Sequence, residues 1–177
     1  IILDVGGSVD GFGASPLAAG VVTTILMCDI VDSTATAERL GDGAWRQVLM
    51  RHNRSVRLLL DRFHGREVAM TGDGFLACFE SATSAVRCAT AIRDAVAQLG
   101  IACRVGLTTG EVERIGDDLR GIAVHLAARV MAAAAPSEVL VTEVTRALVD
   151  GRGPRFAPAG ERQLKGFGQP VALYRVE

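Results

Sequence analysis

The sequence lacks a large excess of either charge, long uninterrupted apolar runs and a targeting segment. Its 177 residues carry 19 Lys and Arg against 20 Asp and Glu. A net charge of -1 supplies no basic surface for nucleic acid or an anionic membrane. The longest apolar stretches, such as 122–135, are interrupted by a histidine and an arginine and fall short of the ~20 residues of a membrane-spanning helix. The opening residues also lack the basic, apolar and small-residue order of a signal peptide. We therefore expect no nucleic-acid partner and, within this segment, no membrane.

The sequence also lacks paired cysteines. Its four cysteines lie inside apolar stretches, and no two of them form a CxxC pair: Cys28, Cys78, Cys88 and Cys103. This spacing is typical of neither a zinc site nor a disulfide framework. We interpret them as reduced core residues of a cytoplasmic protein.

The length and composition predict one globular domain. Hydrophobic residues make up 49% of the chain and charged residues 22%. Residues 1–20 are rich in Gly, Ser and Ala without a clear period, and the sequence begins at Ile1 rather than Met. We interpret residues 1–20 as a linker from an upstream domain and residues 21–177 as the domain itself.

Hydrophobic periodicity predicts alternating strands and helices. We expect strands at 21–28, 67–70, 75–79, 101–108, 139–142, 155–164 and 171–176, the second and third of them forming a hairpin. We expect helices at 34–64, with a break near 41–43, and at 81–99, 121–135 and 143–150. Residues 112–119 are polar and contain glycine, without an assigned element. The pattern predicts an α+β fold, a sheet with helices packed against it.

Two aspartates interrupt apolar runs. Asp29 ends the first strand, where a buried carboxylate needs a partner. Asp73 lies in the hairpin turn, and taken alone it is more readily a structural Asp-Gly turn. If the first strand lies beside the hairpin, the two carboxylates meet at one edge of the sheet.

The segment after Asp29 has two interpretations. Asp32, Ser33 and Thr34 have the residue types of helix N-caps. The backbone amides of residues 30–33 would also form an anion cradle at a helix N-terminus. Paired carboxylates beside such a cradle suit Mg²⁺-dependent triphosphate chemistry.

Four segments, in order, resemble motifs of class III adenylyl and guanylyl cyclase catalytic domains. Residues 24–34 (TILMCDIVDST) and 71–77 (TGDGFLA) are similar to the two metal-binding segments of that family. Residues 118–129 (DLRGIAVHLAAR) resemble its later signature, and 164–166 (LKG) its triphosphate-binding lysine segment. The resemblance implies a ferredoxin-like βαββαβ sandwich core with additional C-terminal strands and a helix.

The resemblance also implies a role for each matching residue. Asp29, Asp73 and the Ile30 carbonyl would hold two divalent cations, Mg²⁺ or Mn²⁺. Arg129 would stabilise charge on the α-phosphate and Lys165 would reach the terminal phosphates. Asp118 would read an adenine base, and the backbone of the segment Val31, Asp32, Ser33 and Thr34 would contact the triphosphate.

Two positions depart from the family pattern. The purine-reading lysine falls at Ala69, which cannot hydrogen-bond a base, and the catalytic asparagine falls at His125. His125 and Arg129 are four residues apart and share one helix face. His125 is either a substitute for the asparagine or a bystander, and both interpretations remain open.

The resulting expectation is an adenylate cyclase that converts ATP into 3′,5′-cyclic AMP and pyrophosphate at a homodimer interface, with side activity on GTP. The alternative is a catalytically silent nucleotide-binding or dimerisation module that regulates an upstream domain. Ala69 and His125 favour the alternative, whereas the intact metal, arginine and lysine positions favour the enzyme.

Overall fold

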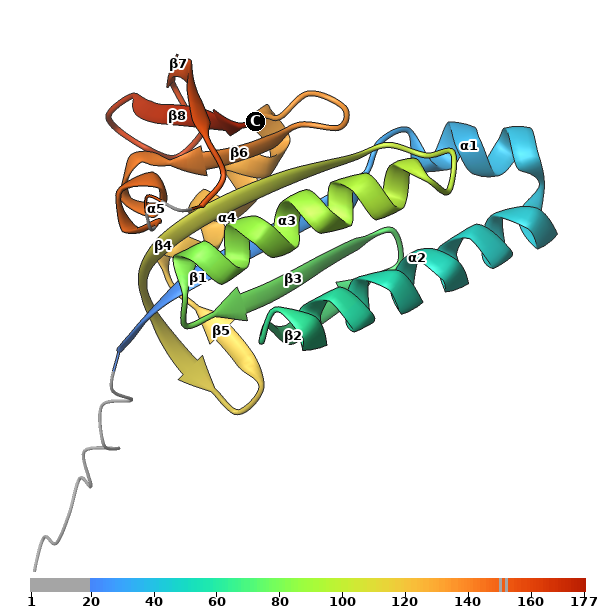
Figure 1. The fold of residues 1–177 in the computed structure, drawn as a ribbon, viewed down its shortest axis with the longest axis horizontal. Helices are drawn as coiled ribbons and strands as arrows, with labels where there is room; N and C mark the ends of the chain where they lie inside the picture. The colour runs from blue at the N-terminus through green and yellow to red at the C-terminus, as the bar shows by residue number, and fades with distance from the viewer. Residues whose placement is uncertain (1–19, 150, 152) are drawn as a thin grey trace, which may run out of the picture.

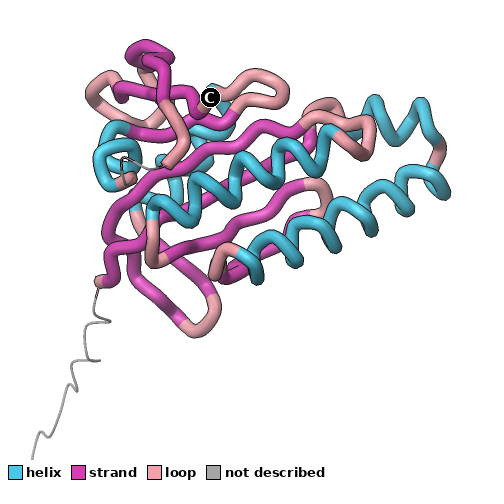
Figure 2. Tube along the Cα trace, viewed as in Figure 1, coloured by secondary structure: helices cyan, strands magenta, loops and turns pink. Residues whose placement is uncertain are grey.

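In the computed structural model of this protein, residues 20–149, 151 and 153–177 are described, so nearly all of the expected linker (1–20) lies outside the described residues. The first half of the chain forms β1 (Val21–Ile30), α1 (Ser33–Leu40), α2 (Asp42–Arg62), β2 (Arg66–Thr71), β3 (Gly74–Phe79), α3 (Ala82–Ala97) and β4 (Cys103–Ile115). The second half forms β5 (Asp118–Arg120), α4 (Ile122–Ala133), β6 (Val139–Thr142), α5 (Glu143–Leu148), β7 (Phe156–Arg162) and β8 (Val171–Val176). Figures 1 and 2 show these elements along the chain.

The strands form one sheet in the order β2-β3-β1-β4-β6-β8-β7, with β5 paired to β4. Strand β1 is antiparallel to both β3 and β4, and β4 is parallel to β6. The order β2-β3-β1-β4, with helices between β1 and β2 and between β3 and β4, is a ferredoxin-like core. The predicted α+β class, with its additional C-terminal strands and helix, is confirmed.

Helices cover both faces of the sheet, and β1 packs against both layers because its successive residues point to opposite sides. Leu26 and Cys28 pack with the apolar faces of α2 and α3, which lie side by side in Figure 1. Ile25 packs instead with Ala123 and Ala127 of α4 on the other face. The central part of β1, which leads to Asp29, is thus held between two helical layers.

Most of the expected elements are present, and the predicted break in the first long helix falls at Gly41. The prediction of a strand at 101–108 ended it too early. In the structure, β4 continues to Ile115 and the chain then turns back as β5. The segment left unassigned at 112–119 is therefore a two-stranded hairpin. Figure 1 shows this hairpin projecting from the edge of the molecule, which explains why most of its residues are polar and exposed.

The four cysteines are free, and three of them, Cys28, Cys88 and Cys103, are buried. Within the described ranges, no helix combines the length and the apolar character needed to cross a membrane.

Candidate active site

Strand β1 and the β2–β3 turn bring the two candidate metal ligands together. Asp29 lies directly opposite Gly74 in the β1–β3 ladder, and Gly74 is the residue that follows Asp73. The backbone N–H of Ile30 donates to the backbone oxygen of Asp73 over 3.1 Å. The Ser33 hydroxyl donates to Oδ2 of Asp73, which fixes that carboxylate toward the start of α1. The predicted meeting of strand end and turn is therefore present.

Gly74 allows this close approach. A Cβ at this position would lie 3.1 Å from the Cys28 carbonyl oxygen and 3.5 Å from Oδ1 of Asp29. The first distance is tighter than ordinary van der Waals contact, so a larger residue would push the turn away from β1. The glycine keeps the Asp73 turn against the Asp29 carboxylate.

Arg104 is a site residue that the sequence analysis missed. It lies opposite Asp29 in the β1–β4 ladder, and its Nη2 is 3.0 Å from Oδ2 of Asp29. The two side chains are 35% and 25% exposed, so the pair is only partly shielded from water. An arginine inside an otherwise apolar strand segment, between Cys103 and Val105, was the available signal. Its guanidinium adds positive charge beside the carboxylates, and a guanidinium can pair with an anionic oxygen.

Fewer backbone amides are available to bind an anion than the sequence predicted. The Ile30 amide already donates to Asp73, and the Val31 amide donates to the Ala102 carbonyl over 2.8 Å. Asp32 occupies the N-cap position of α1 with a left-handed backbone, φ 52°, and its side chain makes no capping hydrogen bond. The open donors are thus those of the first turn of α1, beginning at Ser33 and Thr34, because a helix leaves its first amides without intrahelical acceptors.

Helix α4 presents His125 and Arg129 on its exposed side. The helix is seated tightly on β4, since a Cβ on Gly106 would lie 2.2 Å from the backbone nitrogen of Met131. No side chain other than hydrogen fits between this strand and the helix, so Gly106 fixes the height of α4 above the sheet.

Asp118 and Lys165 lie at two other exposed places. Asp118 begins β5, where its Oδ1 accepts from the Leu119 amide over 2.9 Å and its Oδ2 is 3.5 Å from Arg120. Lys165 follows the buried Leu164 in the turn between β7 and β8. Across the described residues, no hydrogen bond or ion pair joins Asp118, Arg129 or Lys165 to the two aspartates. One chain therefore assembles the carboxylate half of the expected site, and its contacts do not link the other expected residues to that half.

Ala69 lies on β2 and lines a cavity of about 220 Å³ together with Asp29, Thr71, Leu76 and Met131. Apolar side chains form most of its wall. Ala69 leaves this cavity without the hydrogen-bond donor that a lysine would supply there.

His52, on α2, is a second residue that the sequence analysis missed. It is fully buried, and its ring centroid lies 6.4 Å from that of Phe75, next to the Asp73 turn. Its Nδ1 pairs with the Asn53 side-chain oxygen over 2.9 Å, and its Nε2 has no partner among the described residues. Burial lowers the pKa of His52, opposed by the Asn53 hydrogen bond and the Asp73 charge. The ring is therefore a neutral packing group under the turn.

Asp29 and Asp73 alone are too few to hold a metal ion, so water or a bound substrate would have to supply further ligands. The described residues contain no group of three or more His, Cys, Asp or Glu side chains that could hold an ion alone. Mg²⁺ usually keeps one or two carboxylates together with waters and substrate phosphates. Asp29, Asp73 and a backbone carbonyl such as that of Ile30 fit this type of site.

The chain matches the model of one protein family over nearly all of its length. The model of the adenylate and guanylate cyclase catalytic domain matches residues 20–177. The chain belongs to this family. Divalent metal ions are generally used by class III cyclase domains, in agreement with the donor set described above.

Individual relatives agree with this placement. A Rhizobium meliloti (strain 1021) protein named "Putative adenylate cyclase 3" is 30% identical over 162 residues, which are 86% of this chain. The chain spans only 28% of that relative's length. The adenylyl cyclase CyaB from P. aeruginosa has the same fold, with a TM-score of 0.81 and 22% identity over 90% of this chain and 96% of that one. The adenylate/guanylate cyclase/hydrolase structure from Silicibacter pomeroyi is 27% identical, with a TM-score of 0.77 over 90% of this chain and 98% of that one.

Proposed function

We propose that this domain is an adenylate cyclase that converts ATP into 3′,5′-cyclic AMP and pyrophosphate at the interface of a homodimer. The observation that carries the proposal is the junction of β1 with the β2–β3 turn, where Asp29 and Asp73 are held together beside Arg104 and the start of α1. Family membership supports the reaction class.

On one chain, Asp29, Asp73 and the Ile30 carbonyl would hold two divalent cations. When bound, these ions lower the pKa of the attacking hydroxyl and neutralise charge on the leaving pyrophosphate. Ser33 keeps Asp73 turned toward the site. The amides of the first turn of α1, and Arg104 once it is released from Asp29, would hold the phosphate chain.

The second chain would supply Arg129, Lys165 and Asp118. In the reaction, the ribose 3′-oxygen gives its proton to solvent and bonds to the α-phosphorus, while the bond from that phosphorus to the bridging oxygen breaks and pyrophosphate leaves. Arg129 would stabilise the charge that develops on the α-phosphate, and Lys165 would bind the terminal phosphates. Both side chains are exposed and neither is bonded to the aspartates of its own chain, which supports a site shared between two copies.

Base selection would be incomplete. Asp118 would accept a hydrogen bond from the adenine amino group, but Ala69 contributes no donor to the neighbouring wall. We therefore include side activity on GTP in the proposal.

A second candidate function is a silent nucleotide-binding or dimerisation module. Ala69 and His125 depart from the family pattern, and Arg104 occupies one oxygen of Asp29. Binding of a non-cyclisable ATP analogue without any cyclic product, under Mg²⁺ or Mn²⁺, would support this candidate over the enzyme.

The shared site is tested by mixing two inactive variants. Asp73→Ala removes a group expected from one chain, and Arg129→Ala removes a group expected from the other. A mixed dimer would carry both lesions in one site and leave its second site whole. After subunit exchange, we expect up to about a quarter of wild-type activity, since roughly half of the dimers are mixed and each has one good site. No recovery in dimers shown to be mixed would contradict the shared site.

A further inference from the structure

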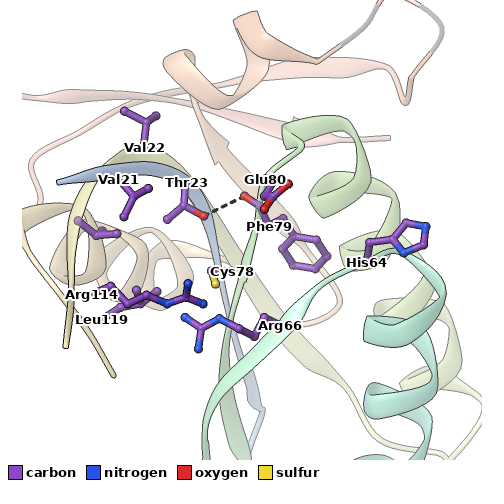
Figure 3. Close-up of a pocket in the computed structure, with 11 residues that line it drawn as sticks. Val21, Val22, Thr23, His64, Arg66, Cys78, Phe79, Glu80, Arg114 and Leu119 are labelled. Carbon is purple, nitrogen blue, oxygen red and sulfur yellow. Dashed lines mark hydrogen bonds between the residues drawn. The ribbon is translucent and has the colours of Figure 1, made fainter. Parts of the chain in front are cut away.

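A cavity of about 180 Å³ lies at the opposite end of β1 from the aspartates. Val21 and Val22 line it, whereas Asp29 lies eight residues further along the strand, ~26 Å away at the rise of an extended chain. Figure 3 shows its walls, which come from β1, β2, β3 and the β4–β5 hairpin. None of its lining residues belongs to the proposed catalytic site.

Arg66 on β2 has unused donors at this cavity. Its Nη1 donates to the Asp117 backbone oxygen over 3.2 Å. Its Nε and Nη2 are buried, and neither has a partner among residues 20–149, 151 and 153–177. Buried guanidinium N–H groups without an acceptor are costly, so Nε and Nη2 call for an acceptor that the described residues do not supply.

Further positive or ionisable groups line the same cavity. Figure 3 shows the guanidinium of Arg114, from β4, turned toward that of Arg66, with His64 at the far wall. Among the described residues, Glu80 is the one acidic residue of the lining, and it lies across the cavity beside Thr23 in the same view. Two like charges directed at each other are stabilised when an anion binds between them. Arg114 is exposed, so its side chain can move to admit the anion to Arg66.

The rest of the cavity is apolar. Val21, Val22, Val112 and Leu119 line it, and Val22 is 70% exposed. Such a wall offers nothing to a fully hydrated inorganic anion but can bury a short hydrocarbon chain.

We propose that this cavity is a binding site for a small organic carboxylate, with the carboxylate between Arg66 and Arg114 and the apolar body against the valines and Leu119. The planar fork of arginine matches the two carboxylate oxygens. The volume limits the ligand to a few carbon atoms beyond the carboxylate.

Butyrate is the test ligand, and its binding to the purified 177-residue chain is measured by calorimetry at fixed ionic strength. We expect saturable binding, and we expect Arg66→Gln to weaken it at least tenfold. Arg114→Gln should weaken it as well. Arg51→Gln, which changes an exposed arginine on α2, is the matched control and should leave the affinity unchanged.

The same variants report on stability. Without ligand, Arg66→Gln should unfold at the same temperature as the wild type or higher, because it removes a charged group with two buried N–H groups that lack a partner among the described residues. Saturating butyrate should raise the unfolding temperature of the wild type but not that of Arg66→Gln.

Three results would overturn the proposal. The first is equal butyrate affinity in wild type and Arg66→Gln. The second is inorganic phosphate binding as tightly as butyrate, since that would leave the apolar wall without a role. The third is loss of self-association in Arg66→Gln during sedimentation, which would make the arginine pair part of a protein interface.

Discussion

Replacing Arg104 by glutamine separates a catalytic role from a structural one. Its Nη2 lies 3.0 Å from Oδ2 of Asp29, and the gross attraction at an effective dielectric constant of ~20 is about 5.5 kcal/mol. Both side chains are partly exposed, so desolvation and screening reduce the net contribution to about 1 kcal/mol or less. Its Nε is buried without a partner among the described residues, which reduces the contribution further. We therefore expect the unfolding temperature to fall by at most about 4 °C, at roughly 2–4 °C per kcal/mol for a domain of this size.

The expected effect on turnover is much larger. If Arg104 binds the phosphate chain in the transition state, its loss should lower kcat/KM for ATP by about 10²–10³. Cyclic AMP formation with Mn²⁺ and thermal unfolding would be measured on the same preparations. Arg57→Gln is the matched control. Arg57 forms an exposed ion pair with Glu67, with 2.8 Å between Nε and Oε2, and neither residue belongs to the proposed site. Turnover within threefold of wild type, or a fall in unfolding temperature above about 8 °C, would refute the reasoning.

Three further predictions follow from the site. Arg129→Ala should lower kcat for cyclic AMP formation at least a hundredfold, because it removes transition-state charge stabilisation, whereas His125→Ala should change kcat only a few-fold. Equal, severe losses would show that His125 takes part in the reaction. The ratio of kcat/KM for ATP and GTP should be only about 10–100, since Ala69 supplies none of the ~1–3 kcal/mol of a base-reading hydrogen bond; complete rejection of GTP would mean that other groups read the base. Finally, the lowered pKa of His52 means that the unfolded chain binds the proton more tightly than the folded one. The free energy of unfolding should therefore decrease as the pH falls below about 6.5, by at most about 1.4 kcal/mol per pH unit, and His52→Gln should remove that part of the slope in denaturant titrations. An unchanged slope in the variant would contradict this assignment.

Each carboxylate could be singled out because its neighbours in the sequence mark it, although the meeting of the two was predicted only on the condition that the first strand lies beside the hairpin. Asp29 ends an apolar strand and Asp73 lies in a two-residue turn, so the pairing of one strand with one hairpin is enough to bring them together. The helix break at Gly41 and the four-residue spacing of His125 and Arg129 are local features of the same kind. Sequence patterns report such features directly, because each depends on a few neighbouring residues.

The missed features depend on contacts between distant segments. Arg104 and Asp29 are 75 residues apart, and only the β1–β4 register makes them neighbours. His52 occupies a position of the apolar stripe of α2, between Val48 and Val56, but its polar side chain concealed its burial. The predicted strand at 101–108 stopped too early. The outer half of β4 leaves the core and is polar, and hydrophobic periodicity cannot distinguish such a segment from a loop.

The exposed side of α4 gives the strongest physical argument for a second copy of the chain as partner. Ile122 is 68% exposed on this helix, on the same exposed side as His125 and Arg129. Ile115, at the end of β4 beside Asp118, is 44% exposed. Large apolar side chains next to charged groups of a proposed site are typical of a surface that a partner covers. Among the described residues, the carboxylate junction of the same chain contacts Arg104 but makes no hydrogen bond or ion pair with Arg129. A head-to-tail pair would supply Arg129 to each junction and cover the exposed isoleucines in the same step.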